Sequence, residues 1–228
     1  MNKKSCCTQL VSFCDSLALS LNENIRTHVI YFDFQKAFDS VNHDIILEKI
    51  KISIWHRWYS FIFFVYYLKN RMQCVVIGNE ASSDSAVISG VPQVSIVGPT
   101  LFVLFINDIT QCVTPGTYIA LYADDTKIWR PINSQDDHCI LQKDINSLST
   151  WVTRNKMKFH PDKSKVLEVY NGTISINSFS YTLNSDTIEY TPCEKDLGVN
   201  IVPKLTWTEH SDILYSKANQ RLGILKRN

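Results

Sequence analysis

The sequence predicts a mixed α+β fold, in which short strands and amphipathic helices share one core. Short runs rich in β-branched and aromatic residues indicate the strands, and longer segments with apolar residues at helical spacing indicate the helices. The 228 residues are 45% hydrophobic, which is enough to bury one sizeable core. Because 23 basic and 22 acidic residues nearly cancel, no overall charge marks a nucleic-acid or membrane protein.

The first third of the chain is expected to form a helix, a strand and a second helix. Apolar residues recur at helical spacing over residues 10–21. The run 29–34 is apolar and β-rich, apart from the single charge of Asp33. Residues 36–50 are expected to form a helix with an apolar stripe, which comprises Phe38, Val41, Ile45 and Ile46.

The central segments predict a strand, a buried helix and a hairpin. Residues 74–79 end in a Gly-Asn turn signal, and Pro99 suits the first turn of a helix. Residues 101–109 are apolar on nearly all sides, so this helix should lie inside the core. Two β-rich runs, 118–123 and 126–129, flank Asp124-Asp125, which is expected to form the turn of a hairpin.

The last third begins with a helix that Ser134 should start. The helix is expected to bury an apolar stripe, which comprises Leu141, Ile145, Leu148 and Val152. Short strands are expected at 166–170, 174–176 and 198–202, and the tail from residue 209 has helical apolar spacing.

Cysteines and apolar runs bear on cellular location. The seven cysteines are an odd number without metal-ligand spacing, which indicates reduced thiols in an intracellular protein, either nuclear or cytoplasmic. The apolar run 61–68 is far shorter than the roughly 20 residues that a membrane span needs. We therefore expect no membrane anchor.

Three carboxylates stand out chemically. An Asp within an apolar strand needs a partner, so Asp33 should cap a helix, pair with a lysine such as Lys36, or face a cation. Asp124 and Asp125 are adjacent like charges, which occur in ordinary turns or beside a cation. If the two strands are neighbours, the three side chains converge as hard oxygen ligands for Mg²⁺. Paired ions of this kind recur in phosphoryl transfer.

Ordered blocks of sequence resemble the reverse transcriptases of non-LTR, jockey-like retrotransposons. They are residues 31–41 (YFDFQKAFDSV), 90–99 (GVPQVSIVGP), 122–125 (YADD), 160–164 (HPDKS) and 196–199 (DLGV). The resemblance covers nearly the whole chain, and blocks in a fixed order are more specific than any single motif.

The resemblance implies an RNA-directed DNA polymerase with a right-hand fold. Residues 1–28 would be partial fingers, 29–44 the first part of the palm, and 45–95 a fingers insertion. Residues 96–202 would complete the palm, and 203–228 would start the thumb. The chain would begin inside the fingers, without the upstream blocks.

The resemblance also assigns catalytic roles. Asp33 and Asp124 would be the principal ligands of two Mg²⁺ ions, or Mn²⁺ in their place, with the Phe34 carbonyl assisting and Asp125 completing the acidic triad. Lys163 would protonate the leaving pyrophosphate as a general acid. Without the resemblance, the sequence around Lys163 is equally consistent with an ordinary lysine exposed to solvent.

Further positions match the substrate contacts of the family. Phe38 would exclude the 2′-hydroxyl of a ribonucleotide, and Gln93 would lie near the incoming base. Arg71, Tyr122 and Gly198 would contact nucleic acid. Without the resemblance, Phe38 is a core residue and Gly198 a turn glycine.

The implied partners are an RNA template, a DNA primer and deoxynucleoside triphosphates. The chain departs from the family at Val94, which replaces a small glycine beside Gln93. An alternative is therefore a catalytically inactive remnant that at most binds nucleic acid. A group II intron maturase or an RNA-dependent RNA polymerase palm is less consistent with Phe38.

Overall fold

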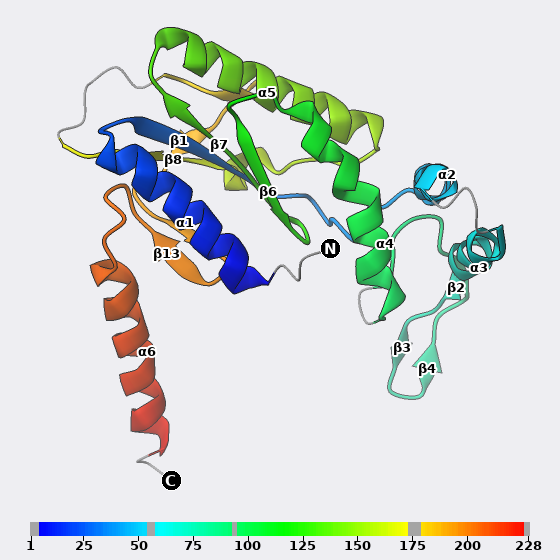
Figure 1. The fold of residues 1–228 in the computed structure, drawn as a ribbon. Helices are drawn as coiled ribbons and strands as arrows, with labels where there is room; N and C mark the ends of the chain where they lie inside the picture. The colour runs from blue at the N-terminus through cyan, green and yellow to red at the C-terminus, as the bar shows by residue number, and fades with distance from the viewer. Residues whose placement is uncertain (1–4, 54–57, 93–94, 173–178, 226–228) are drawn as a thin grey trace.

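A computed structural model describes residues 5–53, 58–92, 95–172 and 179–225. Its centre is a five-stranded sheet with the order β11-β8-β1-β7-β6 (Figure 1). The strands are β1 (Arg26–Phe32), β6 (Tyr118–Tyr122), β7 (Asp125–Ile132), β8 (Lys165–Val169) and β11 (Glu189–Tyr190). With helices packed on this sheet, the predicted α+β class is confirmed.

Strand β1 lies in the middle of the sheet and pairs antiparallel with both β7 and β8. In the register with β7, Tyr31 is opposite Lys127 and Phe32 is opposite Thr126. Strand β11 is parallel to β8 at the sheet edge. The end of β1 therefore lies beside the start of β7, at the β6–β7 hairpin.

The two faces of the sheet carry different layers, because successive residues of a strand point to opposite sides. Ile30 and Ile128 pack in the larger core, to which α5 (Gln135–Arg154) contributes. Val29 and Trp129 pack on the opposite face in a smaller core with α1 (Cys6–Asn22). The two helices thus cover opposite faces (Figure 1).

Helix α5 follows its sequence prediction closely. Ser134 is the N-cap, and Asp137 completes a capping box with it. The predicted stripe is buried: Leu141, Ile145, Leu148 and Val152. Strand β8 also matches its predicted position.

The buried central helix is shorter than predicted. Helix α4 (Val97–Ile106) is followed by the 3₁₀ helix η1 (Asn107–Cys112), so the α-helical geometry does not extend to residue 109. Leu101 and Phe105 are fully buried, whereas Val103 is 51% exposed. The helix therefore has one exposed face, contrary to the sequence prediction.

The predicted helix over residues 36–50 is wrong in its first half. Helix α2 covers His43–Ser53, and a turn precedes it. The Asn42 side chain accepts a hydrogen bond from the Ile45 N–H at 3.1 Å, which fixes the helix start. Lys36 has a φ of 47°, which is incompatible with a continuous right-handed helix.

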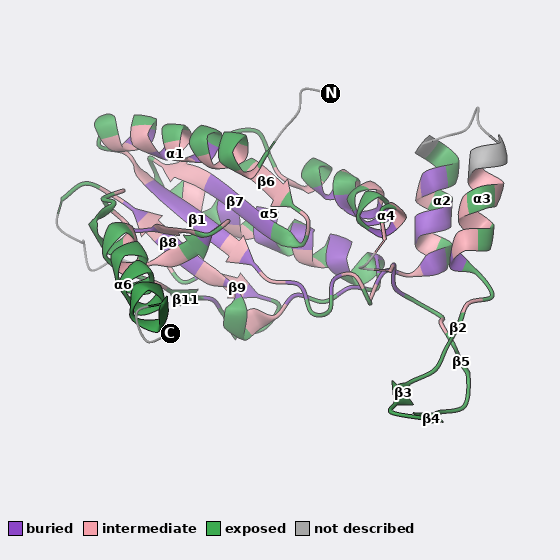
Figure 2. Cartoon of the chain, turned by 90° about the horizontal axis from the view of Figure 1, so that it is seen from below, coloured by how far each residue is buried: buried purple, intermediate pink, exposed green. Residues whose placement is uncertain are grey.

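Helix α2, helix α3 (Trp58–Leu68) and a projecting hairpin form a lobe beside the sheet (Figure 2). The hairpin contains β2 (Met72–Gln73), β3 (Val76–Ile77), β4 (Glu80–Ala81) and β5 (Ser85–Ala86). The predicted strand over 74–79 is thus limited to two residues, and Ile77 is 77% exposed. Its apolar residues do not pack on the core.

The C-terminal region contains short strands and one exposed helix. Its elements are η2 (Pro161–Lys163), β9 (Thr182–Leu183), β10 (Asp186–Thr187), β12 (Glu194–Asp196), β13 (Val199–Ile201) and α6 (Thr208–Leu225). The predicted strand over 198–202 is β13, and the one over 174–176 lies outside the described residues. Helix α6 buries none of its residues.

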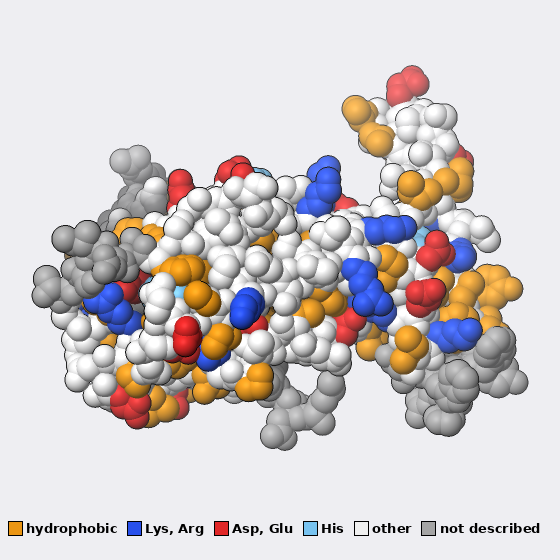
Figure 3. All heavy atoms as spheres, turned by 90° about the horizontal axis from the view of Figure 1, so that it is seen from above, with side chains coloured by type: hydrophobic (Ala, Val, Ile, Leu, Met, Phe, Trp, Pro, Cys, Tyr) orange, Lys and Arg blue, Asp and Glu red, His pale blue; other side chains and the backbone are white. Residues whose placement is uncertain are grey.

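Two predictions about composition can be compared with the structure. All seven cysteines are free thiols, as predicted. Among the described helices, none is both long and apolar enough to cross a membrane. On the face shown in Figure 3, acidic and basic side chains are interspersed, in keeping with the net charge of +1.

Candidate active site

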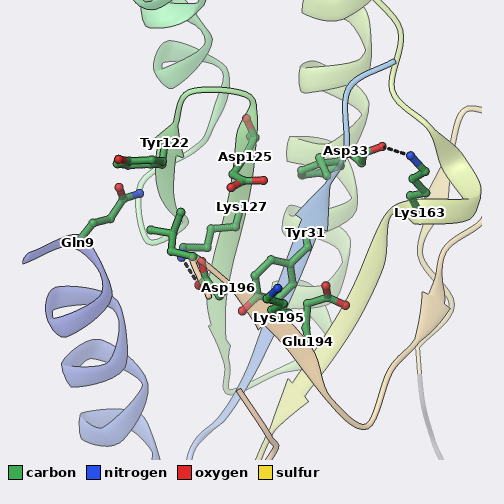
Figure 4. A pocket seen from close by; sticks show the side chains of 13 residues that line it. Gln9, Tyr31, Asp33, Tyr122, Asp125, Lys127, Lys163, Glu194, Lys195 and Asp196 are labelled. Atoms are coloured by element: carbon green, nitrogen blue, oxygen red, sulfur yellow. Dashed lines mark hydrogen bonds and ion pairs between the residues drawn. The ribbon is translucent and has the colours of Figure 1, made fainter. Parts of the chain in front are cut away.

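An open cavity of about 260 Å³ lies where β1 ends and β7 begins (Figure 4). Asp33 and Asp125 both line it, and they come from these two neighbouring strands. Lys163 and Tyr122 line the same cavity, as does Gln9 of helix α1. Four of the residues predicted from the sequence are therefore brought together here. We call this the acidic cavity.

Asp33 directly follows β1 and has a lysine partner. Its Oδ2 lies 3.3 Å from Lys163 Nζ, and its carbonyl accepts a hydrogen bond from the His160 N–H at 2.8 Å. The side chains are 42% and 64% exposed, respectively. The lysine that pairs with Asp33 is Lys163 and not Lys36, which the sequence had suggested as one alternative.

The turn of the β6–β7 hairpin is displaced by one residue from its predicted position. Tyr122 pairs with Asp125, so the two turn residues are Ala123 and Asp124. Ala123 adopts the left-handed conformation with a φ of 53°, which a two-residue hairpin turn requires. As a result, Asp125 begins the strand and lines the cavity, whereas Asp124 lies at the tip of the hairpin, and both residues are exposed.

The cavity has an excess of negative charge. Loss of hydration raises the pKa of Asp125 most, followed by the charges of Asp124 and Asp196. Asp33 also raises this pKa, whereas Lys127 lowers it. A cation between these carboxylates would relieve their repulsion.

The carboxylates fit a divalent cation in chemistry, but they do not form a closed site by themselves. Within the described part of the chain, no three His, Cys, Asp or Glu side chains are grouped closely enough to hold a metal ion. Mg²⁺ is usually held by one or two carboxylates, with waters and substrate phosphates completing its shell. The donor set present here suits that mode of binding.

A buried ion pair under the cavity was not predicted from the sequence. Lys127 of β7 pairs with Asp196 of β12, and both side chains are only 5% exposed. Lys127 Nζ also lies 4.2 Å from the centre of the Phe13 ring. A charge within the β-rich run 126–129 is the signal that could have indicated it, by the reasoning applied to Asp33.

The β12–β13 hairpin reaches the acidic cavity through its turn. Leu197 lines the cavity, and Gly198 is the second residue of the turn. The φ of Gly198 is 93°, which favours glycine, and a Cβ there would meet no atom within 4 Å. Glycine is therefore favoured at this position by its backbone conformation, and not by a lack of space for a side chain.

Phe38 belongs to a neighbouring, larger cavity of about 710 Å³, which Tyr122 also lines. The Phe38 ring stacks on Phe102 of α4, with 4.5 Å between ring centres. Phe34 is buried, and its ring centre lies 4.6 Å from that of Phe159. Phe34 thus presents its backbone near Asp33 while its side chain anchors the turn.

Two predicted contacts lie apart from the acidic cavity or outside the described chain. Arg71 lines a separate cavity of about 460 Å³, together with Asp39 and Gly90. Gln93 and Val94 lie outside the described residues.

A mainly antiparallel sheet with acidic residues at the adjoining ends of two central strands is the architecture of a polymerase palm. Comparison with known families agrees with this class, because residues 3–201 match the family "Reverse transcriptase (RNA-dependent DNA polymerase)". The chain therefore belongs to the reverse transcriptase family.

Similar proteins come from mobile elements of Drosophila melanogaster. The chain is 29% identical over 203 residues to "RNA-directed DNA polymerase from mobile element jockey" and 27% identical over 209 residues to "Probable RNA-directed DNA polymerase from transposon BS". The alignments cover 86% and 87% of this chain, respectively. The chain spans only 22% of the length of each of these relatives.

Solved structures with a similar fold include a truncated apo telomerase from Candida Tropicalis. The TM-score is 0.59 at 12% identity, with 86% of this chain and 39% of that chain covered. A likeness at this identity shows the shared fold, in agreement with the polymerase palm-like arrangement.

Proposed function

We propose that this chain carries the nucleotidyl-transfer centre of a non-LTR retrotransposon polymerase. It would add deoxynucleotides to a DNA primer on an RNA template. The family match supports the reaction class, and the relatives named above support the class of element. The observation that carries the proposal is that Asp33 and Asp125 line one open cavity at the ends of paired strands.

Asp33, Asp124 and Asp125, with the carbonyl of Phe34, would hold two Mg²⁺ ions or Mn²⁺ in their place. When bound, these ions would activate the primer 3′-hydroxyl and stabilise the leaving oxygen. The raised pKa of Asp125 is consistent with this assignment, because it reflects loss of hydration first and then the nearby negative charges, which a cation would neutralise. Asp124 is exposed at the turn, so it is accessible to an ion that arrives with the substrate.

Lys163 would act as the general acid for pyrophosphate. It lies at the edge of the acidic cavity, and 64% of its side chain is exposed. Its ion pair with Asp33 holds the ammonium group beside the reacting position. A lysine held there can donate a proton to the departing oxygen.

The remaining predicted residues would contact the substrates. Phe38, held by its stacking on Phe102, would exclude ribonucleotides, and Gln93 would lie near the incoming base. The predicted contacts to nucleic acid are Arg71, Tyr122 and Gly198.

The odd cysteine count, which is unsuited to a disulfide framework, supports an intracellular location.

Primer extension by the purified chain tests this proposal. An RNA template with a DNA primer is supplied with Mg²⁺ or Mn²⁺ and with deoxy- or ribonucleotides in separate reactions. We expect metal-dependent incorporation of deoxynucleotides and rejection of ribonucleotides. Incorporation of ribonucleotides alone would favour an RNA polymerase, and no incorporation with either substrate would favour an inactive remnant.

A further inference from the structure

We propose that the hairpin of residues 72–86 forms a symmetric dimer, in which one edge of the hairpin pairs with the same edge of a second copy of this chain. Every residue from 72 to 86 is exposed, and Figure 2 shows the hairpin projecting from the lobe. We call it the projecting hairpin. The inference does not depend on the proposed function, because none of these described residues lines the acidic cavity.

One edge of the projecting hairpin has unpaired backbone groups. The Ser82 N–H donates to the Val75 carbonyl and the Val87 N–H donates to the Arg71 carbonyl, both at 2.9 Å, so these two carbonyls face inward. Backbone groups alternate in direction along a strand, so the intervening and following residues face outward. The outward-facing residues are Met72, Cys74 and Val76. Among the described residues, the strands of the hairpin pair only with each other, which leaves this edge open to another strand.

The apolar side chains on this edge have no core on either face of the hairpin. Met72, Val75 and Val76 are 58%, 64% and 63% exposed, respectively. Because successive residues of a strand point to opposite faces, apolar side chains are exposed on both faces of the ribbon. A two-stranded hairpin is only marginally stable by itself, whereas three or more strands with an apolar face are stable. Pairing with a second hairpin gives a four-stranded sheet and brings these side chains into cross-strand contact.

The distribution of charge distinguishes the two edges of the projecting hairpin. The strand of residues 72–77 contains no charged residue, whereas the returning strand contains Glu80 and Asp84. Pairing of the returning strand with its own copy would bring like charges together, which destabilises a sheet. Exposed edge strands commonly carry charged residues or proline that prevent such pairing, and residues 72–77 include neither. The uncharged edge is therefore the one that accepts a second copy of itself.

A two-fold axis at Cys74 gives the register of this pairing. In an antiparallel pair about that axis, Cys74 lies opposite its own copy, and Met72 lies opposite Val76 of the partner subunit. The outward-facing backbone groups of all three residues are then paired, with no charged side chain among them. Because each copy uses the same edge, the assembly closes as a dimer and does not extend into a fibre.

Sedimentation equilibrium of the purified chain over a range of concentrations tests the proposal. We expect the wild type to show a monomer–dimer equilibrium without larger species. Val76→Lys places a charge on the pairing edge and should raise the dissociation constant at least about tenfold. Ala81→Lys is the matched control, because Ala81 pairs with Val76 across the hairpin and lies on the other edge. Both positions are exposed, so circular dichroism should show an unchanged fold.

A short bismaleimide crosslinker, which joins two neighbouring thiols, tests the register. Directly opposite residues of an antiparallel pair have Cα atoms about 5.5 Å apart or less, so the two copies of Cys74 should be joined into a covalent dimer. Cys74 is an exposed free thiol, as is Cys139 of α5. We expect Cys74→Ser to lose the covalent dimer and Cys139→Ser to retain it.

A monomeric wild type, an unchanged dissociation constant in Val76→Lys, or equal weakening by Ala81→Lys would overturn the proposal. Growth beyond a dimer would also overturn it, because it would indicate head-to-tail pairing of two different edges. A covalent dimer that persists in Cys74→Ser would contradict the register. None of these measurements requires nucleotide incorporation, so a dimeric chain without polymerase activity would reject the proposed function and leave the dimer supported.

Discussion

Lys127, near the start of β7, forms an ion pair with Asp196 that joins this strand to the β12–β13 hairpin at the acidic cavity (Figure 4). The pair is almost completely buried, and the Phe13 ring packs against the ammonium group. Burial makes hydration unavailable to either charge, so each depends on the other. The position of the Leu197–Gly198 turn beside the cavity therefore depends on this pair.

Removing one partner should cost far more stability than removing both. We expect Lys127→Met to lower the free energy of unfolding by about 3–5 kcal/mol, because it leaves Asp196 buried and unpaired. The double variant Lys127→Met with Asp196→Leu should be close to the wild type, since an apolar pair suits the Phe13 surroundings. Urea unfolding of the two single variants and the double variant measures the coupling. Additive losses would show that the two side chains do not interact.

A smaller side chain at Phe38 should relax sugar selection. We expect Phe38→Val to raise ribonucleotide incorporation relative to deoxynucleotide incorporation by at least about tenfold, because the smaller side chain leaves room for the 2′-hydroxyl of the ribose. Phe38→Tyr keeps the ring and should keep the selection. Single-nucleotide incorporation with each sugar gives the ratio for both variants. An equal ratio in the wild type and Phe38→Val would assign the ring to the core alone, through its stacking on Phe102.

The proposed catalytic residues were predicted more easily than the residues that support them. Asp33 and Asp125 are charges in apolar or turn contexts, so chemistry alone singles them out, and the cavity contains both. Asp196 lies next to a turn, where acidic residues are common, and only tertiary packing buries it. The charge of Lys127 in a β-rich run signals a buried lysine, but its pairing with Asp196 follows only from the placement of the two hairpins.

At the scale of elements, a polar network ties α5 to the sheet. His138 of α5 and His28 of β1 each place Nδ1 2.9 Å from the Tyr181 hydroxyl, and Glu168 of β8 lies 3.6 Å from His28. Burial lowers the pKa of His138, and the charge of His28 lowers it further. Asp137 and Glu168 act in the opposite direction, but the net shift is downward.

The lowered pKa of His138 predicts that the free energy of unfolding decreases as the pH is lowered through the range where histidine titrates. Since the folded pKa of His138 is below the ordinary value of 6.5, the unfolded chain binds the proton more readily. Stability should therefore be complete above about pH 7.5 and decrease as pH falls through about 6.5 toward the lowered value. Urea midpoints from about pH 7.5 to about pH 5 measure it.

Substitutions separate His138 from the other titrating groups. The pKa values of Asp137 and Glu168 are lowered, so both carboxyls remain charged in this window. His138→Gln should reduce the loss of stability between the two pH limits, whereas His210→Gln, outside the network, should not. The same pH dependence in all three proteins would exclude His138 as its source.

Elements with strong local signals were predicted, and those determined by long-range packing were not. Helix α5 has both a capping box and a periodic stripe, so its bounds follow from sequence. Residues 36–42 have helical apolar spacing, but tertiary contacts hold them in a turn against Ser89 and Gly90. The hairpin turn shifted by one residue because Ala123, a poor turn former by composition, takes the left-handed position.

At the scale of the molecule, the larger core and the acidic cavity lie at different parts of the sheet. The face under α5 carries the larger core, whereas the acidic cavity involves residues from β1, β7, α1 and the β12–β13 hairpin. The pairing of β1 with β8 joins segments that are distant in sequence, so composition and periodicity do not determine the sheet order. The family resemblance implied a polymerase palm, but no strand order was predicted from the sequence.

The central claim is that the carboxylates of the acidic cavity perform nucleotidyl transfer. The most direct measurement is the rate of single-deoxynucleotide incorporation on a primed RNA template by the wild type, Asp33→Asn, Asp125→Asn and the control Asp186→Asn. Asp186 is exposed on β10 and does not line the cavity. We predict losses on the order of a thousandfold for the two cavity variants and an unchanged rate for the control. Undiminished incorporation by Asp33→Asn and Asp125→Asn, or none by the wild type, would contradict the account.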